Sequence, residues 1–155
     1  MAYQESLKER MTLIGTIDPA SLTAATAKYS DVVDMKYHAR ALIAVLMGPA
    51  TTTKMAATAL TINVFECTST GTAASTAIHT ATVTRAQTTA DLGQQVVLEV
   101  KDSDLGSVHT TYNRYFKVGV TPGTNAVEGG VVIFGTDSRY SKASTNDLST
   151  TVIDS

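Results

Sequence analysis

The side chains able to act as nucleophiles or metal ligands are few and far apart in the sequence. Cys67 is the only cysteine, and the three histidines are His38, His79 and His109. A cysteine nucleophile needs an imidazole base within hydrogen-bond reach, and a zinc site needs several such ligands close together. No two histidines form a His-x-His or His-x-x-x-His pair. We therefore expect Cys67 to be a small buried apolar residue and the histidines to occupy ordinary surface positions.

Two short motifs could bind an ion or a phosphate group. The run Asp102-Ser103-Asp104-Leu105-Gly106 is like the start of a calcium loop, but the third acidic ligand and the glutamate at the twelfth position are missing. A turn between two strands explains the same residues. The pair Gly129-Gly130 lacks the Lys-Ser/Thr of a phosphate loop, and a Gly-x-Ser-x-Gly elbow is absent from the sequence. We expect no enzyme activity, no cofactor and no metal.

Composition narrows the function classes further. The chain has 155 residues, a net charge of −2, 17% charged residues and 6% aromatic residues. Lysine and arginine are scattered singly, which argues against nucleic-acid binding. The longest apolar stretch, residues 41–47, is far shorter than the roughly 20 residues that span a bilayer. Residues 1–10 mix charges and lack the apolar run of a signal peptide, so we expect synthesis in a cytoplasm.

The elements that would position these side chains are strands. Threonine is abundant, and the β-branched side chain suits a pleated surface. Turn signals at Gly48-Pro49 and Thr121-Pro122-Gly123 separate apolar segments, and no long amphipathic helix lies between them. The alternation of apolar and polar residues predicts seven strands: Asp31–Lys36, Arg40–Met47, Ala59–Cys67, Ala77–Ala86 (as an edge strand), Gln95–Lys101, Tyr112–Thr121 and Gly130–Gly135.

This pattern predicts an all-β fold. We expect a single β-sandwich, jelly-roll or immunoglobulin-like, of about seven or eight antiparallel strands with extended N- and C-terminal arms. The predicted boundaries are an N-terminal arm over residues 1–28, the sandwich over residues 29–137 and a polar C-terminal tail over residues 138–155.

Two of the predicted strands are apolar on both faces. In Arg40–Met47 and Gly130–Gly135 neither face is polar, so each strand either lies at the centre of the fold or meets a partner. The arms and the low-charge Thr/Ala surface also favour assembly over catalysis. The predicted interface residues are Tyr3, Leu7, Met11, Ile43, Val45, Met47, Val132, Phe134, Arg139 and Tyr140.

Four segments carry a resemblance to a known family. They are Ser30–Met35 (SDVVDM), Tyr37–Ile43 (YHARALI), Arg114–Thr121 (RYFKVGVT) and Val132–Tyr140 (VIFGTDSRY). Together they resemble recurring stretches of the small head decoration (cement) proteins of tailed bacteriophages, over roughly residues 30–140. The motifs are loose strand patterns and include no catalytic signature.

The resemblance implies a structural role. It implies a β-sandwich on the outer capsid that binds the major capsid protein and itself, with a trimer expected. From the charge distribution and the short apolar stretches we expect no nucleic acid and no membrane as partner. The protein would be made in the bacterial host cytoplasm and located on the virion. Two alternatives stay open: another virion component (a tail, neck or head-completion protein) and a carbohydrate-binding β-sandwich module.

Overall fold

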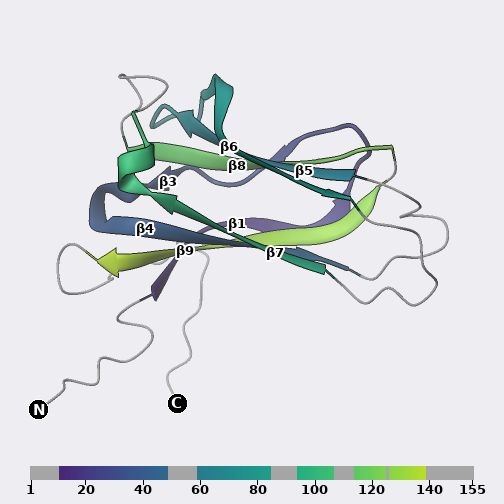
Figure 1. Ribbon diagram of the computed structural model, residues 1–155, viewed down its shortest axis with the longest axis horizontal. Helices are drawn as coiled ribbons and strands as arrows, with labels where there is room; N and C mark the ends of the chain where they lie inside the picture. The colour runs from purple at the N-terminus through teal and green to yellow at the C-terminus, as the bar shows by residue number, and fades with distance from the viewer. Residues whose placement is uncertain (1–10, 49–58, 85–93, 107–113, 125, 139–155) are drawn as a thin grey trace, which may run out of the picture.

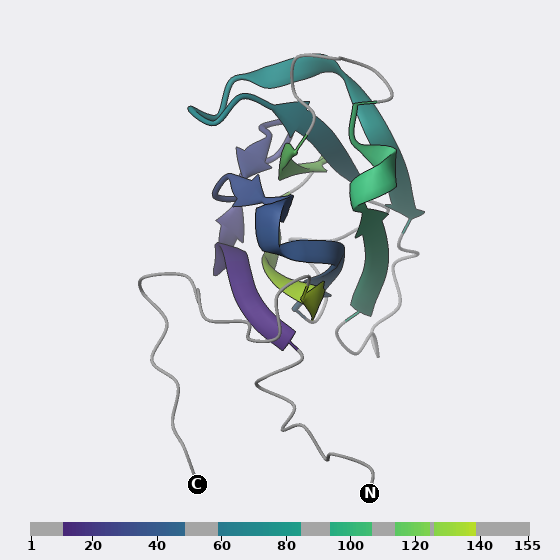
Figure 2. The ribbon, with the colours of Figure 1, turned by 90° about the vertical axis from the view of Figure 1, so that its left-hand side faces the viewer.

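The computed structural model describes residues 11–48, 59–84, 94–106, 114–124 and 126–138. Within these ranges the chain folds into two antiparallel β-sheets that face each other as two layers (Figures 1 and 2). The predicted all-β sandwich is therefore confirmed. The described helices are two three-residue 3-10 turns, Met35–Tyr37 and Asp102–Asp104, and neither is long enough to cross a membrane.

The first sheet has four strands. Across the sheet they run in the order β1 (Met11–Leu22), β9 (Val127–Ser138), β4 (His38–Met47) and β7 (Gln94–Lys101). Strands β9 and β4 are therefore its two central strands. A central position was one of the two explanations given above for the apolar residues on both of their faces. Each hydrogen-bonds on both sides, so their side chains occupy the middle of the sheet.

The second sheet has three longer strands and two short ones. The order is β2 (Lys28–Tyr29), β8 (Tyr115–Pro122), β5 (Ala59–Cys67) and β6 (Ala73–Thr84), and β3 (Val33–Asp34) also pairs with β8. The bounds of β5 match the prediction. Strand β6 is an edge strand, also as predicted. The strand expected over residues 31–36 is reduced to β3, because Met35 begins a 3-10 turn that the Asp34 side chain caps.

The strand order decides between the two sandwich topologies. Strands β2 and β3 both pair with β8, so they count as one interrupted strand. The chain then pairs its first strand with its last, its second with its next to last, β4 with β7 and β5 with β6. This is a long hairpin wound onto itself, which is the jelly roll.

The N-terminal segment is part of the sandwich, and this corrects the predicted arm over residues 1–28. Strand β1 pairs with β9 from Met11↔Thr136 to Leu22↔Val127, although its sequence contains Gly15 and Asp18-Pro19. The pairing register shifts once beside Gly15 and once between Ile17 and Ala20, so two irregularities accommodate these strand-breaking residues. Residues 1–10 and 139–155, where the rest of the predicted arm and tail falls, lie outside the described residues.

The core lies between the two sheets. Its largest fully buried apolar side chains come from both layers and from the turn after β3: Phe116, Met35, Ile43, Leu60, Ile62 and Ile133. The predicted inward positions Phe116, Val118 and Val120 of β8 are all fully buried. Burying each large apolar side chain stabilises the fold by about 1.5–3 kcal/mol, and this is the main contribution that holds the two layers together.

His38 is a core residue, although we expected a surface position. Its side chain is 2% exposed, and a Cβ atom added to Gly135 would lie 2.6 Å from its Cγ atom, so the ring packs directly on the β9 backbone. Burial lowers the pKa of His38, and the nearby Asp34 charge offsets this only in part. The imidazole is therefore neutral at pH 7 and acts as a packing group.

The placement of β1 in the sheet predicts that single core contacts on this strand stabilise the whole fold. Ile17 is 3% exposed, and we expect Ile17→Ala to lower the free energy of unfolding by about 2–5 kcal/mol. Leu46→Ala, at a position that is 43% exposed, is the matched control and should change it by less than about 0.5 kcal/mol. Urea unfolding followed by circular dichroism measures both; equal small effects would contradict a structural role for β1.

Burial of a neutral His38 also predicts a dependence of stability on pH. Because the pKa is lowered in the folded state, the unfolded chain binds more protons at this residue in acid. The free energy of unfolding should fall as the pH drops through about 6.5, the value of an ordinary histidine, and the loss should be complete below the lowered pKa. Urea midpoints at neutral and acid pH, compared with those of His38→Leu, measure this contribution. An identical pH dependence in the variant would contradict it.

Candidate functional site

The cysteine is placed for packing and is poorly suited to catalysis. Cys67 ends β5 and is fully buried. Burial raises its pKa to about 11, although the charge of Lys117 lowers it in part. At neutral pH the thiol stays protonated, and a protonated thiol is a weak nucleophile.

The acidic turn after β7 is held by protein groups. Asp104 Oδ2 accepts hydrogen bonds from the Lys101 backbone N–H at 2.9 Å and from His79 Nε2 at 3.2 Å. Burial raises the pKa of Asp104, but these two bonds, together with the charges of His79 and Lys101, outweigh it and the pKa is lowered. Within the described ranges no group of three or more His, Cys, Asp or Glu side chains could hold a metal ion. The arrangement is that of a structural turn.

A buried carboxylate that the sequence analysis missed anchors the same turn. Glu66 is fully buried, and its Oε1 accepts a hydrogen bond from the Gly106 N–H at 2.7 Å. The sequence does contain a sign of this role. The inward positions of β5 are Leu60, Ile62, Val64 and Glu66, so a glutamate stands in an otherwise apolar row. A charged residue at such a position predicts a hydrogen-bond partner inside the protein.

The outer faces of the two sheets differ in chemistry. On the β5–β6–β8 sheet, threonine hydroxyls and an asparagine amide cover one part of the outer face, and the ring pair Tyr29 and Phe65 covers another. Thr82, Thr61 and Thr121 lie in one row across three strands, and in the next row Thr80 Oγ1 donates to Asn63 Oδ1 at 2.9 Å. These groups hydrogen-bond with water at low cost, so this face is suited to solvent.

The outer face of the β1–β9–β4–β7 sheet is apolar in its middle. Pairing aligns two neighbouring rows across the four strands: Leu13, Phe134, Leu42 and Glu99 in one, and Thr16, Val132, Ala44 and Val97 in the other. Leu46 extends the surface toward the end of β4. We call the seven residues Leu13, Leu42, Ala44, Leu46, Val97, Val132 and Phe134 the apolar face.

Part of the apolar face is open to solvent. Val97 is 60% exposed and Leu46 is 43% exposed, and the other five side chains are partly buried by their neighbours on the sheet. Among the described residues these two are half of the exposed large hydrophobic side chains, together with Tyr29 and Tyr37. Exposed apolar surfaces that are contiguous in this way are found at binding surfaces for proteins and other ligands.

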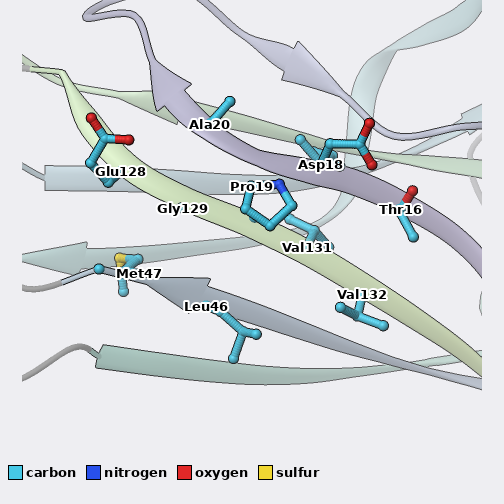
Figure 3. A pocket seen from close by; sticks show the side chains of 13 residues that line it. Thr16, Asp18, Pro19, Ala20, Leu46, Met47, Glu128, Gly129, Val131 and Val132 are labelled. Carbon is cyan, nitrogen blue, oxygen red and sulfur yellow. The ribbon is translucent and has the colours of Figure 1, made fainter.

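One end of the apolar face is hollowed. A cavity of about 500 Å³ is lined by Thr16, Pro19, Leu46, Gly130 and Val132 among others (Figure 3). The irregularity in β1 brings Pro19 over the β9 backbone, where a Cβ atom at Gly130 would lie 2.9 Å from the Ile17 carbonyl oxygen. Glycine at this position therefore permits the close approach that shapes the hollow.

The opposite end of the apolar face carries charged side chains that form ion pairs with one another. Arg40 on β4 contacts Glu99 on β7 at 3.0 Å and Asp137 on β9 at 3.1 Å. All three side chains are substantially exposed, so the two ion pairs contribute little to stability. They link β7, β4 and β9 at this border through one guanidinium and two carboxylates.

The predicted interface residues separate into three groups. Val132 and Phe134 lie on the apolar face, and Met11 lies at its margin opposite Thr136; whether they contact a partner stays a prediction. Four others, Tyr3, Leu7, Arg139 and Tyr140, fall outside the described residues.

The remaining three predicted interface residues were assigned to the wrong face of β4. Ile43, Val45 and Met47 are at most 5% exposed and pack in the core. Their neighbours Leu42, Ala44 and Leu46 point outward instead. Both sets are apolar, so the alternation could not show which one faces inward. Val97 was also missed, although it stands as an apolar residue among the outward positions Gln95, Glu99 and Lys101.

No protein-family model matches the sequence, and no curated protein matches it. Among solved structures, a chain of Bacillus endospore appendages, a family of disulfide-linked pili, is 16% identical, with 88% of this chain and 98% of that chain covered and a TM-score of 0.40.

Two viral structures are also similar in fold. A chain of infectious bursal disease virus, Gt strain, is 8% identical, with 91% of this chain and 35% of that chain covered and a TM-score of 0.48. A chain of broad bean stain virus is 11% identical, with 99% and 100% covered and a TM-score of 0.46. All three TM-scores are below 0.5.

Proposed function

We propose that this chain is a non-enzymatic structural subunit of a virus particle that docks through the apolar face of its β1–β9–β4–β7 sheet. More specifically, we propose a head decoration (cement) protein of a tailed bacteriophage, bound to the major capsid protein on the outside of the shell. The observation that carries the proposal is the contrast between the two outer faces, one covered with threonine and the other with leucine, valine and phenylalanine.

Docking through the apolar face is physically favourable. Each square ångström of apolar surface removed from water contributes roughly 25 cal/mol. The charges at its border, Arg40, Glu99 and Asp137, are already paired with one another. These charges lie at the border of the face, so a partner that covers its apolar middle can leave them in contact with water and need not desolvate them.

The fold and the family resemblance support a virion role to different degrees. Jelly rolls occur in viral capsids, but they also occur in lectins and cupins, so the topology alone does not assign a function. The resemblance of residues 30–140 to decoration proteins supplies the location on the head. It also implies assembly of the chain with itself, as a trimer.

A non-enzymatic role is supported by where the reactive groups lie. Cys67 and His38 are both packed in the interior, with a raised and a lowered pKa respectively. His79 is bonded to Asp104 within a structural turn. These groups already serve the fold, which favours a function based on surfaces.

The first test of the proposal is copy number. In particles purified from lysates of the source cells, quantitative mass spectrometry should find this chain in amounts comparable with the major capsid protein. A decoration protein covers the whole shell, whereas a tail, neck or head-completion protein is present in few copies. A low copy number would replace the decoration role with one of these, and absence from particles would contradict the virion assignment.

The second test is a matched pair of charge substitutions. Leu46→Asp places a charge on the apolar face, and Thr82→Asp places the same charge on the exposed threonine face. Both positions are solvent-accessible, so melting temperatures should stay near that of the parent. We expect Leu46→Asp to reduce the amount of this chain in particles by more than about tenfold, and Thr82→Asp to leave it unchanged.

Equal incorporation of the two variants would contradict docking through the apolar face. The carbohydrate-binding alternative gives a different pattern. The exposed aromatic ring Tyr29 lies beside Phe65 on the threonine side of the molecule, with ring centroids 6.1 Å apart. A glycan site there would be insensitive to Leu46→Asp.

A further inference from the structure

The sheet edges of this protein differ in how well they are protected against pairing with another strand. Strand β1 is an edge that carries Pro19 and two register shifts. The edge strands of the second sheet are β6, with two register shifts against β5, and the two-residue strands β2 and β3. Prolines, bulges and short lengths are the usual means of blocking an edge.

Strand β7 has none of these protections. It pairs with β4 in an uninterrupted register from Arg40↔Lys101 to Met47↔Gln94. It is eight residues long and contains no proline. Within the described part of the chain, no strand pairs with its other side. At its middle stands Val97, which is 60% exposed, the largest exposure among the large hydrophobic side chains described.

We infer that β7 pairs antiparallel with β7 of a second copy of this chain, about a two-fold axis at Val97. The inference does not depend on the proposed function, because it concerns the free protein. It differs from the trimer that the family resemblance implies, since pairing of identical edges closes after two subunits.

Side-chain orientation restricts the possible registers. Directly opposed residues in an antiparallel pair lie on the same face of the sheet. Gln95, Val97 and Glu99 face outward, and Val96, Leu98 and Val100 face inward. For both faces to continue into the second copy, the two-fold axis must therefore pass through a residue of β7 and not between two residues.

Among these registers, the one centred on Val97 has the best complementarity. It places Val97 against Val97 of the second copy and Glu99 against Gln95 of the second copy, so that an amide can donate to a carboxylate on each side of the axis. Centring on Leu98 would place Glu99 opposite a valine. Centring on Glu99 would oppose two carboxylates, and centring on Val96 would pair only residues 94–98. The Arg40 contact to Glu99 at 3.0 Å can persist, because a carboxylate accepts several hydrogen bonds.

The pairing would also account for Val97 on the outer face. In the Val97-centred register the two valines lie side by side at the axis and cover each other's exposed edge. The first sheets of the two copies then join into one sheet of eight strands, and their apolar faces become one continuous surface. Val97, the most exposed large hydrophobic side chain described, would thus lie at the centre of the pair.

The register can be tested with two substitutions at one position. Light scattering coupled to size-exclusion chromatography should find a dimer for the parent chain. Gln95→Glu opposes two carboxylates on each side of the axis, and we expect the dissociation constant to rise about tenfold. Gln95→Lys creates two opposite-charge pairs instead and should lower the constant. Effects of the same sign for both variants would overturn the Val97-centred register.

Cross-linking separates edge pairing from stacking of the two apolar faces. Val97→Cys should form a disulfide-linked dimer on mild oxidation, because residue 97 meets its own copy. Leu46→Cys should not, because in the edge pair the two β4 strands are separated by both β7 strands. The parent chain is the negative control, because its native Cys67 is buried and has a pKa of about 11, so it should not cross-link.

Three results would overturn the inference. They are a parent chain that is monomeric at the highest soluble concentration, a dimer that survives Val97→Lys unchanged, and cross-linking that is as efficient at position 46 as at position 97. Failure of these tests leaves the particle experiments above unaffected. Absence from particles would likewise leave the dimer standing.

Discussion

The pairing of the first strand with the last is the constraint on which the rest of this structure depends. Strand β9 can lie inside its sheet only because β1 covers the side that β4 does not. An unpaired row of buried backbone groups would cost more than any single side-chain contact in the molecule supplies. Pairing with β9 therefore outweighs the unfavourable strand propensity of Gly15 and Pro19. Two local register shifts accommodate these residues without interrupting the hydrogen bonds between β1 and β9 on either side.

The same central position explains why β4 and β9 carry apolar residues on both faces. Their inward residues, such as Ile43 and Ile133, fill the core between the layers. Their outward residues, such as Leu42 and Phe134, lie in the middle of the sheet, where neighbouring side chains shield them in part. A sheet with such an outer surface tolerates it in isolation but gains free energy when a partner covers it. The threonine rows of the other sheet bury little apolar surface on contact, which is why the proposed docking surface is the apolar face.

Several polar groups that could in principle react are used to hold the fold together. His38 packs neutral against Gly135, Glu66 accepts a bond from the turn after β7, and Asp104 is held by Lys101 and His79. Each of these groups shapes or stabilises the sandwich. The features left open by the described residues are surfaces and an edge: the apolar face and the free side of β7. Both lie on the same sheet, which makes that sheet the part of the molecule through which association is most readily built.

The sequence by itself predicted the all-β sandwich class and most of the strands, because these follow from local alternation and turn residues. It also singled out β4 and β9 as apolar on both faces, but left open whether they are central or meet a partner. Alternation could not decide which face of β4 is the core, since Ile43 and Leu42 are equally apolar, and it placed the interface on the buried set. It also missed β1, because Gly15 and Pro19 break strands locally and only pairing with β9 overrides them. Only the tertiary structure selected the jelly roll, buried His38 and placed β7 at the edge of the sheet formed by the described strands. These depend on which distant strands become neighbours, and no short-range pattern encodes that.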